Sequence, residues 1–442
     1  MPLLYVNITP SLQRRTGLYL KQQSRCFYTQ KELLSMEYLF TERAHLMCPN
    51  MYFGIAMIVP AMYDKKRVSE AVETLSKVHP FLNAVLGYNE SDNAYFYDVK
   101  DSSTVQLTFE DAEVTSVDSG VITGKYESVT GYDWDITAEG LLKVTAWKAG
   151  KDTCFLLVFH HLLADGRGAL DLCQELADLY VKGIAPAFVQ ERLISSASDF
   201  PKESEMPFIS RFLIKQTNKK CNIEGRTPLS YQDYHEYADR FIKEDRIEHT
   251  LTLPDTDKTA GLISDCKAHS VTVNDLLMAR MFISEKTDKI IIASDLRDKL
   301  ACYNKGALGN YSTAFSIVMK TDSSDEFEMA AKVHKKVRKA LNSPSDLYLV
   351  LQCYASLDPA LLDAAFMASR GAFDSKPAEF IGKKFFAMDS AKGYSITNLG
   401  KIENQNIRSA YFIPPASPAI KMTQGVLTVN GKMIICTSKR DG

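Results

Sequence analysis

The stretch Phe155-Leu-Leu-Val-Phe-His-His-Leu-Leu-Ala-Asp-Gly166 decides how the rest of this chain is interpreted. Its first five residues are apolar and predict a buried strand. That strand delivers His160 and His161 to its end, and Asp165 with Gly166 then turns the chain into a helix. Because imidazole has an unperturbed pKa near neutrality, a histidine fixed in a cleft can take a proton from an alcohol or an amine. The stretch therefore predicts an acid–base site where a strand passes into a helix.

The same residues allow two other interpretations. A lone histidine beside an apolar strand is often a core residue, and His160, His161 and Asp165 could be taken for a two-histidine, one-carboxylate metal site. Neighbouring residues of a strand point to opposite faces, so the two histidines cannot readily bind one ion. We therefore expect no metal, and we expect only one histidine of the pair to face the cleft.

Composition places the chain among ordinary globular proteins. It has 442 residues, 45% of them hydrophobic and 24% charged, which is enough for two domains or one large one. The net charge of −2 gives no reason to expect a nucleic-acid partner or a general attraction to acidic membranes. Basic residues gather only in short pairs that are typical of solvated faces: Arg14-Arg15, Lys219-Lys220 and Lys335-Lys336.

Cysteine usage and the absence of long apolar segments predict the compartment. Nine cysteines are dispersed without CxxC spacing, and several lie in apolar runs, among them Cys154, Cys173 and Cys436. This is typical of reduced thiols in a cytosolic protein. Residues 1–17 contain no apolar segment of signal-peptide length, and no stretch approaches the roughly twenty apolar residues of a membrane span. We expect a soluble, cytoplasmic protein.

Hydrophobic periodicity indicates two successive α/β blocks. The first has a helical stripe at 68–78, strand-like segments at 81–88, 94–99 and 141–147, and a helix after Gly166. The second has strand-like segments at 247–253, 290–297, 394–400 and 425–436, and helices at 273–283 and 325–341. The polar, proline-containing stretch between the blocks predicts a crossover. The expected domains are residues 1–192, a crossover linker at 193–245, and residues 246–442.

An ordered set of motifs makes the chain resemble a known superfamily. His160-His161-Leu-Leu-Ala-Asp165-Gly166 matches the HHxxxDG signature of acyltransferases that use coenzyme A or carrier proteins and share the chloramphenicol-acetyltransferase-like fold. This group includes condensation domains, alcohol acetyltransferases and polyketide-associated acyltransferases. The other motifs follow in family order: His79-Pro80-Phe81-Leu82, Tyr132-Asp-Trp-Asp-Ile136, Gly140-Leu-Leu-Lys-Val144, Ser294-Asp-Leu-Arg297, Gly309-Asn310-Tyr311 and Thr397-Asn-Leu-Gly400.

The resemblance implies both a fold and an activity. The fold would be α/β (α+β), with two similar subdomains forming a pseudo-dimer and the active site in a tunnel between them. The activity would be transfer of an acyl group from an acyl-CoA or acyl-carrier thioester to an alcohol or amine, with no bound cofactor and no covalent acyl-enzyme. Expected partners are the small-molecule donor and acceptor and an acyl- or peptidyl-carrier protein, and a monomer is the expected state.

The resemblance also assigns roles to the residues of the motif. His161 is the expected general base, with His160 as a structural neighbour. Asp165 belongs to the same catalytic motif but is expected to point away from the site and to pair with Arg297, at the end of a predicted buried strand. Gly166 is expected to serve a tight turn, because glycine tolerates strained dihedral angles.

Further side chains are candidates for the reaction itself. The tetrahedral intermediate needs a hydrogen-bond donor near its oxyanion, for which Asn310, Ser312 and Asn398 are candidates, with ordinary turn roles as the alternative for each. Cys154 lies seven residues before His161 in an apolar strand and is expected to pack rather than react.

The sequence also departs from the family pattern. Lys143 and Asn83 stand where arginine is common, Glu139-Gly140 replaces the usual Gly-Pro, and the end at Gly442 is expected to fall short of a last helix. These departures bear on the substrate more than on the chemistry. Two other functions stay open: a condensation- or cyclisation-type enzyme that acts on carrier-bound substrates, and a non-catalytic binding module that retains the fold.

Overall fold

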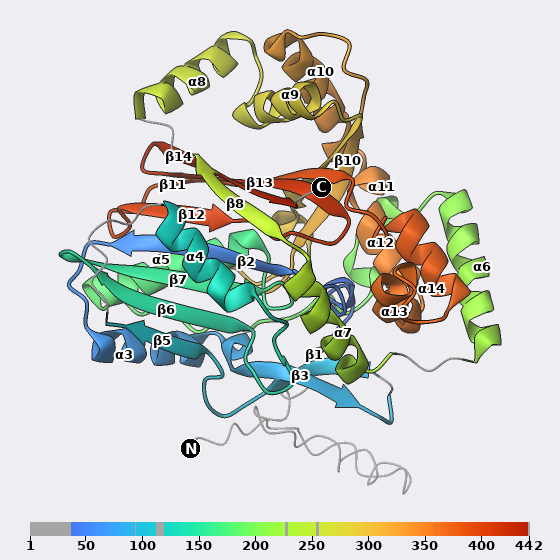
Figure 1. The fold of residues 1–442 in the computed structure, drawn as a ribbon, viewed down its shortest axis with the longest axis horizontal. Coiled ribbons are helices and arrows are strands. Elements are labelled where there is room, and N and C mark those ends of the chain that lie inside the picture. Colours follow the sequence, from blue (N-terminus) through green and yellow to red (C-terminus); the bar gives the residue numbers. More distant parts are fainter. Residues whose placement is uncertain (1–36, 93, 112–118, 226–228, 253–255, 441–442) are drawn as a thin grey trace, which may run out of the picture.

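The structure of this chain is a computed structural model that describes residues 37–92, 94–111, 119–225, 229–252 and 256–440. The N-terminal segment for which we expect no signal peptide, with Arg14-Arg15 and Cys26, lies outside the described residues. The described chain forms two α/β halves, one above the other in Figure 1. The α/β pseudo-dimer expected from the resemblance is therefore confirmed.

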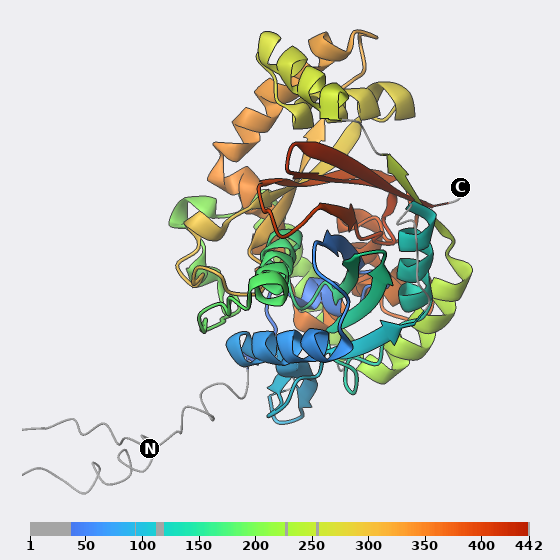
Figure 2. The same cartoon turned by 90° about the vertical axis from the view of Figure 1, so that its left-hand side faces the viewer.

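The first half is built on a five-stranded sheet. Its strands, in spatial order, are β12 (Ser409–Ile413), β2 (Tyr52–Val59), β7 (Asp152–His160), β6 (Leu142–Ala149) and β5 (Gln106–Glu110). The hairpin predicted around Gly150 is the antiparallel pair of β6 and β7. Figure 2 shows helices on both faces of this sheet, which is why its central strands are nearly continuous apolar runs. The helices are α3 (Lys65–Val78) and α5 (Gly166–Lys182) on one face and α4 (Ser119–Thr130) on the other.

Two smaller groups of elements flank this sheet. A three-stranded sheet contains β1 (Glu37–Tyr38), β4 (Ala94–Val99) and β3 (Ala84–Asn89). The strand that we expected at 81–88 begins only at Ala84, because Pro80–Asn83 forms a 3-10 turn after α3. The short helix α2 (Arg43–Leu46) precedes β2.

The second half is built on a six-stranded sheet. Its strands, in spatial order, are β10 (Ser312–Val318), β9 (Lys289–Asp295), β11 (Gly393–Ile402), β13 (Ile420–Val429), β14 (Lys432–Arg440) and β8 (Ile247–Thr252). The predicted hairpin around Asn430-Gly431 joins β13 and β14. The helices of this half are α8 (Thr256–Ala268), α9 (Val273–Glu285), α10 (Glu326–Leu341), α11 (Pro344–Leu347), α12 (Leu349–Ser356), α13 (Pro359–Ser369) and α14 (Lys376–Phe380).

Strand β12 joins the halves, because it belongs to the second half in sequence and to the first half in space. It pairs antiparallel with β2, with Ser409 opposite Ile58 and Ile413 opposite Gly54. The halves therefore share backbone hydrogen bonds as well as a packed surface. The domain boundaries at 192 and 245 stay a prediction.

Two segments differ from the expectations. The strand at 290–297 is half-buried rather than buried: Ile290 and Ile292 face the core, whereas Ala293 is exposed. The stretch at 193–245, to which we assigned no regular structure, contains helices α6 (Phe208–Glu224) and α7 (Tyr231–Glu244). Helix α7 packs into the core of the first half.

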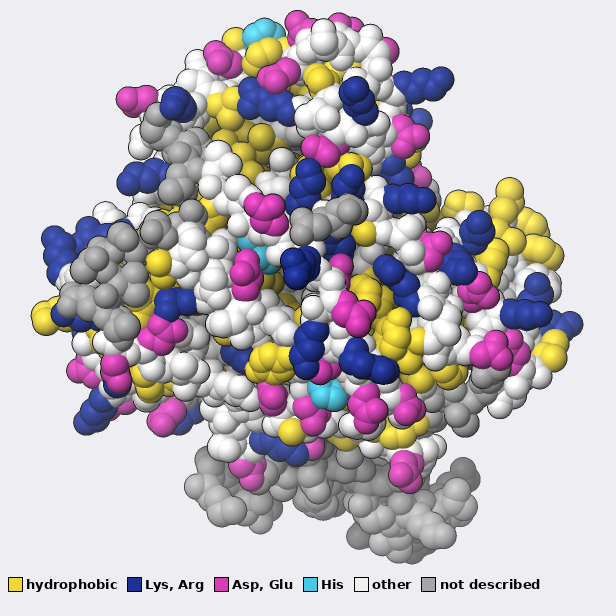
Figure 3. All heavy atoms as spheres, in the orientation of Figure 1, with side chains coloured by type: hydrophobic (Ala, Val, Ile, Leu, Met, Phe, Trp, Pro, Cys, Tyr) yellow, Lys and Arg dark blue, Asp and Glu magenta, His cyan; other side chains and the backbone are white. Residues whose placement is uncertain are grey.

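Helix α6 forms the right-hand edge of the molecule in Figure 1, and hydrophobic side chains gather at the same edge in Figure 3. Among the described residues, no helix is long and apolar enough to cross a membrane.

Candidate active site

A cavity of about 220 Å³ lies between the two halves. The first half contributes Phe53 of β2 and the residues that follow β7, and the second half contributes β9, β10 and β11. Ile291 and Ala293 line it because alternate residues of β9 point away from the core, which explains why that strand is only half-buried. The wall is mainly apolar, and among the predicted site residues it includes His161, Asp165, Gly166 and Ser312.

The two adjacent histidines face different environments, as expected. His160 is buried against the rings of Tyr52 and Trp134, at centroid distances of 5.3 and 6.3 Å. Burial lowers the pKa of His160 to about 3, so this imidazole is neutral. His161 lines the cavity, with the edge of the Phe53 ring at a centroid distance of 5.3 Å. Only His161 is placed to meet a substrate.

Asn310 fixes the tautomer of His161. The Asn310 amide nitrogen donates hydrogen bonds to the carbonyls of His161 and Leu162, at 2.8 and 2.9 Å. Because a carbonyl can only accept, the other side of the amide must be the oxygen, and this oxygen lies 3.0 Å from Nδ1 of His161. Nδ1 therefore carries the proton and Nε2 keeps its lone pair. Burial lowers the pKa of His161 as well, so the neutral form is favoured at neutral pH.

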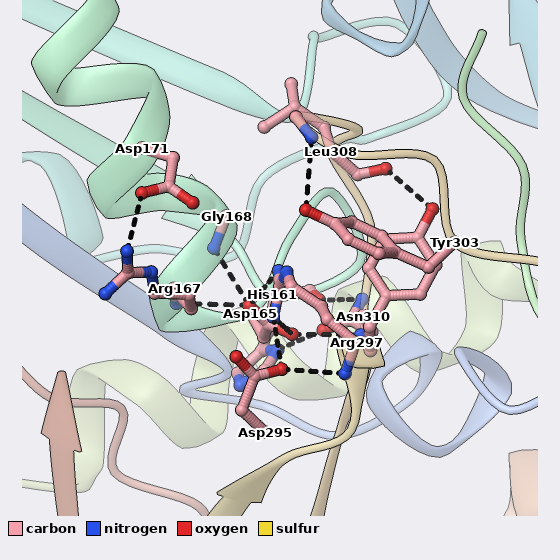
Figure 4. Close-up of polar contacts among 12 residues, drawn as sticks. His161, Asp165, Arg167, Gly168, Asp171, Asp295, Arg297, Tyr303, Leu308 and Asn310 are labelled. Atoms are coloured by element: carbon pink, nitrogen blue, oxygen red, sulfur yellow. Dashed lines mark hydrogen bonds and ion pairs between the residues drawn. The ribbon is translucent and has the colours of Figure 1, made fainter. Parts of the chain in front are cut away.

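Asp165 is held by groups other than His161, and Figure 4 shows it between the first turn of α5 and the guanidinium of Arg297. It caps α5 by accepting from the backbone amides of Arg167 and Gly168 at 3.1 and 3.0 Å. The expected ion pair with Arg297 is present, with nitrogen–oxygen distances of 2.7 and 3.1 Å. The amide of Tyr311 donates to the same carboxylate at 2.9 Å.

The ionisation of Asp165 follows from these contacts. Burial acts to raise the pKa of Asp165, but the charge of Arg297 and the hydrogen bonds outweigh it, and the net shift is downward. The carboxylate is thus ionised at neutral pH, and it joins the two halves. Its contacts with Arg297 and Tyr311 place it as a positioning residue.

Gly166 is needed for a different reason from the one we expected. Its φ angle is not positive, so no strained dihedral is involved. A Cβ atom at Gly166 would instead lie 2.5 Å from Cδ2 of Leu399 on β11. Glycine lets the second half approach the start of α5, and the expectation of a strained turn was wrong.

Glu191 is a second buried carboxylate, besides Asp165, that anchors the two halves to each other, and the sequence analysis did not predict it. Its carboxylate accepts from the backbone amides of Phe81 and Leu308, at 2.7 and 3.2 Å, and contacts Nδ1 of His79 at 2.9 Å. The other ring nitrogen of His79 lies 2.7 Å from Glu175. Burial acts to lower the pKa of His79, but the two carboxylates raise it to about 9. The motif beginning at His79 was recognised, yet nothing near it in sequence pointed to Glu191.

His45 was also missed. Its ring stacks on that of His161, with centroids 4.3 Å apart and planes 16° from parallel. Its Nδ1 is buried and has no hydrogen-bond partner among the described residues. Burial lowers the pKa of His45 well below its ordinary value. A single histidine in a four-residue helix has no spacing signal, so only the structure brings it to the site.

The three oxyanion candidates end up in different places. Asn310 is buried, and its amide nitrogen already donates to two carbonyls. Ser312 lines the cavity. Asn398 is exposed, accepts from the amide of Gly400 at 2.8 Å, and does not line the cavity. Of the three, Ser312 alone shares the cavity wall with His161.

The cysteines and acidic groups suggest no further chemistry at this cavity. The eight cysteines of the described chain are free thiols, and burial raises the pKa of Cys154 to about 12. Cys154 packs within the core of the first half. Within the described ranges, no group of three or more His, Cys, Asp or Glu side chains could hold a metal ion.

Two α/β halves with a histidine loop at their junction define the chloramphenicol-acetyltransferase-like class of transferase folds. Within that class, the chain belongs to the condensation-domain family, whose model matches residues 45–343. No curated protein matches the sequence significantly.

Comparison with solved structures gives the same fold. The polyketide synthase associated protein 5 from Mycobacterium tuberculosis is 15% identical, with a TM-score of 0.56 and 92% of each chain covered. The first condensation domain of the calcium-dependent antibiotic synthetase is 11% identical, with a TM-score of 0.58 over 91% of this chain and 90% of that one. The epimerization domain from the third module of tyrocidine synthetase B is 14% identical, with a TM-score of 0.53 over 91% and 87%. The names of the last two, a condensation domain and an epimerization domain, indicate different reactions, so the fold alone does not specify the chemistry.

Proposed function

We propose that this chain is an acyltransferase in which His161 removes a proton from an alcohol or amine as that group attacks an acyl thioester. The observation that carries the proposal is the hydrogen bond from Nδ1 of His161 to Asn310, because it leaves Nε2 as a proton acceptor at a cavity between the halves. A neutral imidazole with a free lone pair is the form that a general base requires.

The lining of the cavity favours an apolar acyl group. Phe53, Ile291, Ala314 and Phe412 contribute to its wall. A thioester bound there would be shielded from water, and proximity to the acceptor would supply the part of the rate that proton transfer does not. The proposed donor is acyl-CoA or an acyl group on a carrier protein, with no further cofactor.

A second candidate is a condensation-type reaction on carrier-bound aminoacyl or peptidyl substrates, and the family match favours it. Both reactions use the same base and a thioester donor, and they differ in what delivers the substrates. The donor and the acceptor therefore both have to be varied in the assay.

The test is an assay with the purified full chain, a series of acyl-CoA donors, an acyl-loaded carrier protein, and alcohol or amine acceptors that are either free or bound to a second carrier protein. Product and released CoA are quantified chromatographically, because the protein's own free thiols would react with a thiol reagent. We expect His161→Ala to lower kcat by a factor of about 10² to 10⁴. His269→Ala, at an exposed histidine outside the cavity, is the matched control and should retain full activity.

The outcomes separate the candidates. Turnover onto a free alcohol or amine, from acyl-CoA or from acyl-loaded carrier protein, supports the acyltransferase, and turnover only onto an aminoacyl group held by a second carrier protein supports the condensation-type reaction. Turnover that does not depend on His161 would remove the base assignment. No turnover with any donor, together with binding of a loaded carrier, would instead indicate a binding module.

A further inference from the structure

Helix α6 contacts the rest of the protein along one narrow face. Its buried residues are Ile214, Thr217 and Cys221, which are three and four positions apart and so lie in one row. Ile214 and Cys221 pack into a small core that also includes residues of α13. The opposite side of the helix faces solvent.

That opposite side carries large apolar side chains. Five of the thirteen exposed large hydrophobic residues of the described chain lie on α6: Phe208, Ile209, Phe212, Leu213 and Ile223. Phe208, Ile209 and Ile223 are 72 to 75% exposed. Figure 3 shows the resulting patch at the right-hand edge, where Figure 1 places α6. Scattered exposed apolar residues are normal, whereas a cluster on one helix marks an interaction surface.

Basic side chains are interleaved with these apolar ones. At 100° per residue, Phe212, Lys219 and Ile223 point away from the buried row, and Lys215 and Lys220 fall on either side of them. Within α6 the only acidic residue is Glu224, at its last position, where it accepts a hydrogen bond from Ser375. The exposed face is therefore apolar along its middle, with lysines beside the apolar side chains from residue 215 to residue 220. Arg211, nearer the start of the helix, pairs with Glu205.

We propose that α6 docks the protein onto an anionic lipid surface, lying in the plane of the interface with its Phe and Ile side chains among the head groups. An amphipathic helix with bulky apolar residues and lysines beside them is suited to this position, because lysine stems can cover apolar surface while their ammonium groups reach lipid phosphates. The overall charge of −2 does not oppose this, since only charges within about 8 Å act strongly at physiological salt.

Charge opposes two other occupants of this face. A second copy related by two-fold symmetry through α6 would bring an identical cationic helix against it. The chain's own first 36 residues contain five basic and one acidic side chain, so they have the wrong sign as well. From the sequence, the lysine pair at 219–220 was expected to belong to a solvated face. In the structure it lies beside exposed apolar side chains of α6, and we therefore include it in the proposed binding surface.

The test is co-sedimentation of the full chain with large vesicles, either of phosphatidylcholine alone or with about a third of phosphatidylglycerol. We expect binding to the anionic vesicles and weakening by salt. The paired substitutions Phe208→Ser with Phe212→Ser, and Lys215→Glu with Lys219→Glu, should each weaken binding at least about tenfold. Met62→Ser with Val318→Ser, at side chains 78 and 56% exposed elsewhere, is the matched control and should bind like the wild type.

Insertion can be measured directly. Trp134 and Trp147 are fully buried, so brominated lipid should quench neither, and a tryptophan placed by Phe212→Trp should be quenched on anionic vesicles. Unchanged binding by both α6 pairs, or no binding by the wild type, would overturn the proposal. The proposal would also be wrong if the paired substitutions on α6 prevented the protein from binding another protein but left its binding to vesicles intact. None of these readouts depends on catalysis.

Discussion

Asp165 and Glu191 are two buried carboxylates that hold the same loop of the second half, residues 308–311, against the first half. Asp165 accepts from the amide of Tyr311, and Glu191 accepts from the amide of Leu308. Their cationic partners differ. Asp165 pairs with Arg297, which is charged at every working pH, whereas Glu191 contacts His79, which titrates.

The position of Asn310 shows why this difference matters. Asn310 lies between the two anchored residues of the loop and fixes the tautomer of His161. We therefore expect the loop to orient the proposed base while both carboxylates hold it. The Asp165–Arg297 contact does not change with pH, whereas the Glu191–His79 contact weakens at alkaline pH. The contributions of the two contacts to stability can therefore be measured separately.

The largest effect should come from breaking the constant anchor. Arg297→Met leaves the Asp165 carboxylate buried without its partner, which should cost roughly 3–5 kcal/mol in the free energy of unfolding. Equilibrium denaturation in urea measures it. A second substitution, Asp165→Asn, removes the unpaired charge and should restore part of the loss. Full stability and full activity in Asp165→Ala would contradict the role of the ion pair.

A smaller loss is expected at the other anchor. Glu191→Gln keeps an acceptor oxygen for only one of the two amides, because Phe81 donates to Oε2 and Leu308 donates to Oε1. It also removes the charge beside His79, and together these changes should cost about 1–3 kcal/mol in the free energy of unfolding. The same denaturation experiment measures it. Glu205→Gln, at a carboxylate exposed on the surface, serves as the control. A loss as large as that of Arg297→Met would show that the two anchors are equivalent.

The close approach beside Asp165 gives a third test. Gly166→Ala places a methyl group 2.5 Å from Cδ2 of Leu399, so the buried Leu399 side chain must move, and we expect a loss of about 1–3 kcal/mol in the free energy of unfolding. Leu399→Ala in the same chain should relieve the contact. If Gly166→Ala were destabilising to the same extent with and without Leu399→Ala, the cause would lie in the backbone instead.

The last test is a pH dependence from His79. Its pKa is raised from 6.5 to about 9 in the folded protein, so its stabilising contribution is complete below pH 6.5 and is lost as the pH rises through 9. The slope is at most about 1.4 kcal/mol per pH unit for one proton. Unfolding free energies between pH 6.5 and 9 should fall in the wild type but less in His79→Gln. His269→Gln should leave the wild-type slope unchanged.

Local sequence patterns were enough for much of the fold. The apolar run before His160 predicted β7, and Asn430-Gly431 predicted the last hairpin, because both signals lie within a few residues. The contact between Asp165 and Arg297 could be predicted from the motif resemblance. Each of these predictions rested on a pattern within a short segment or on the order of motifs along the chain.

The missed features depend on partners distant in sequence. Gly166 is required by Leu399, and Glu191 by Leu308, and neither pair has a spacing that could be read from the chain. Helix α6 was missed because its apolar side chains face solvent, so its pattern is not that of a core-facing helix. Helix α7 did carry a signal, the spacing of Tyr231, Tyr234, Ala238 and Ile242, which are its buried residues.

Strand β12, which the second half contributes to the sheet of the first half, has a consequence for synthesis on the ribosome. The edge of β2 that pairs with β12 is formed by a strongly apolar segment, and its partner begins at residue 409, 350 positions after β2 ends at residue 59. At about 5–20 residues per second, that edge stays unpaired for roughly 20 to 70 seconds. An open apolar edge of this kind recruits strands from other chains. The nascent first half is therefore a natural client for chaperones until its last strand emerges.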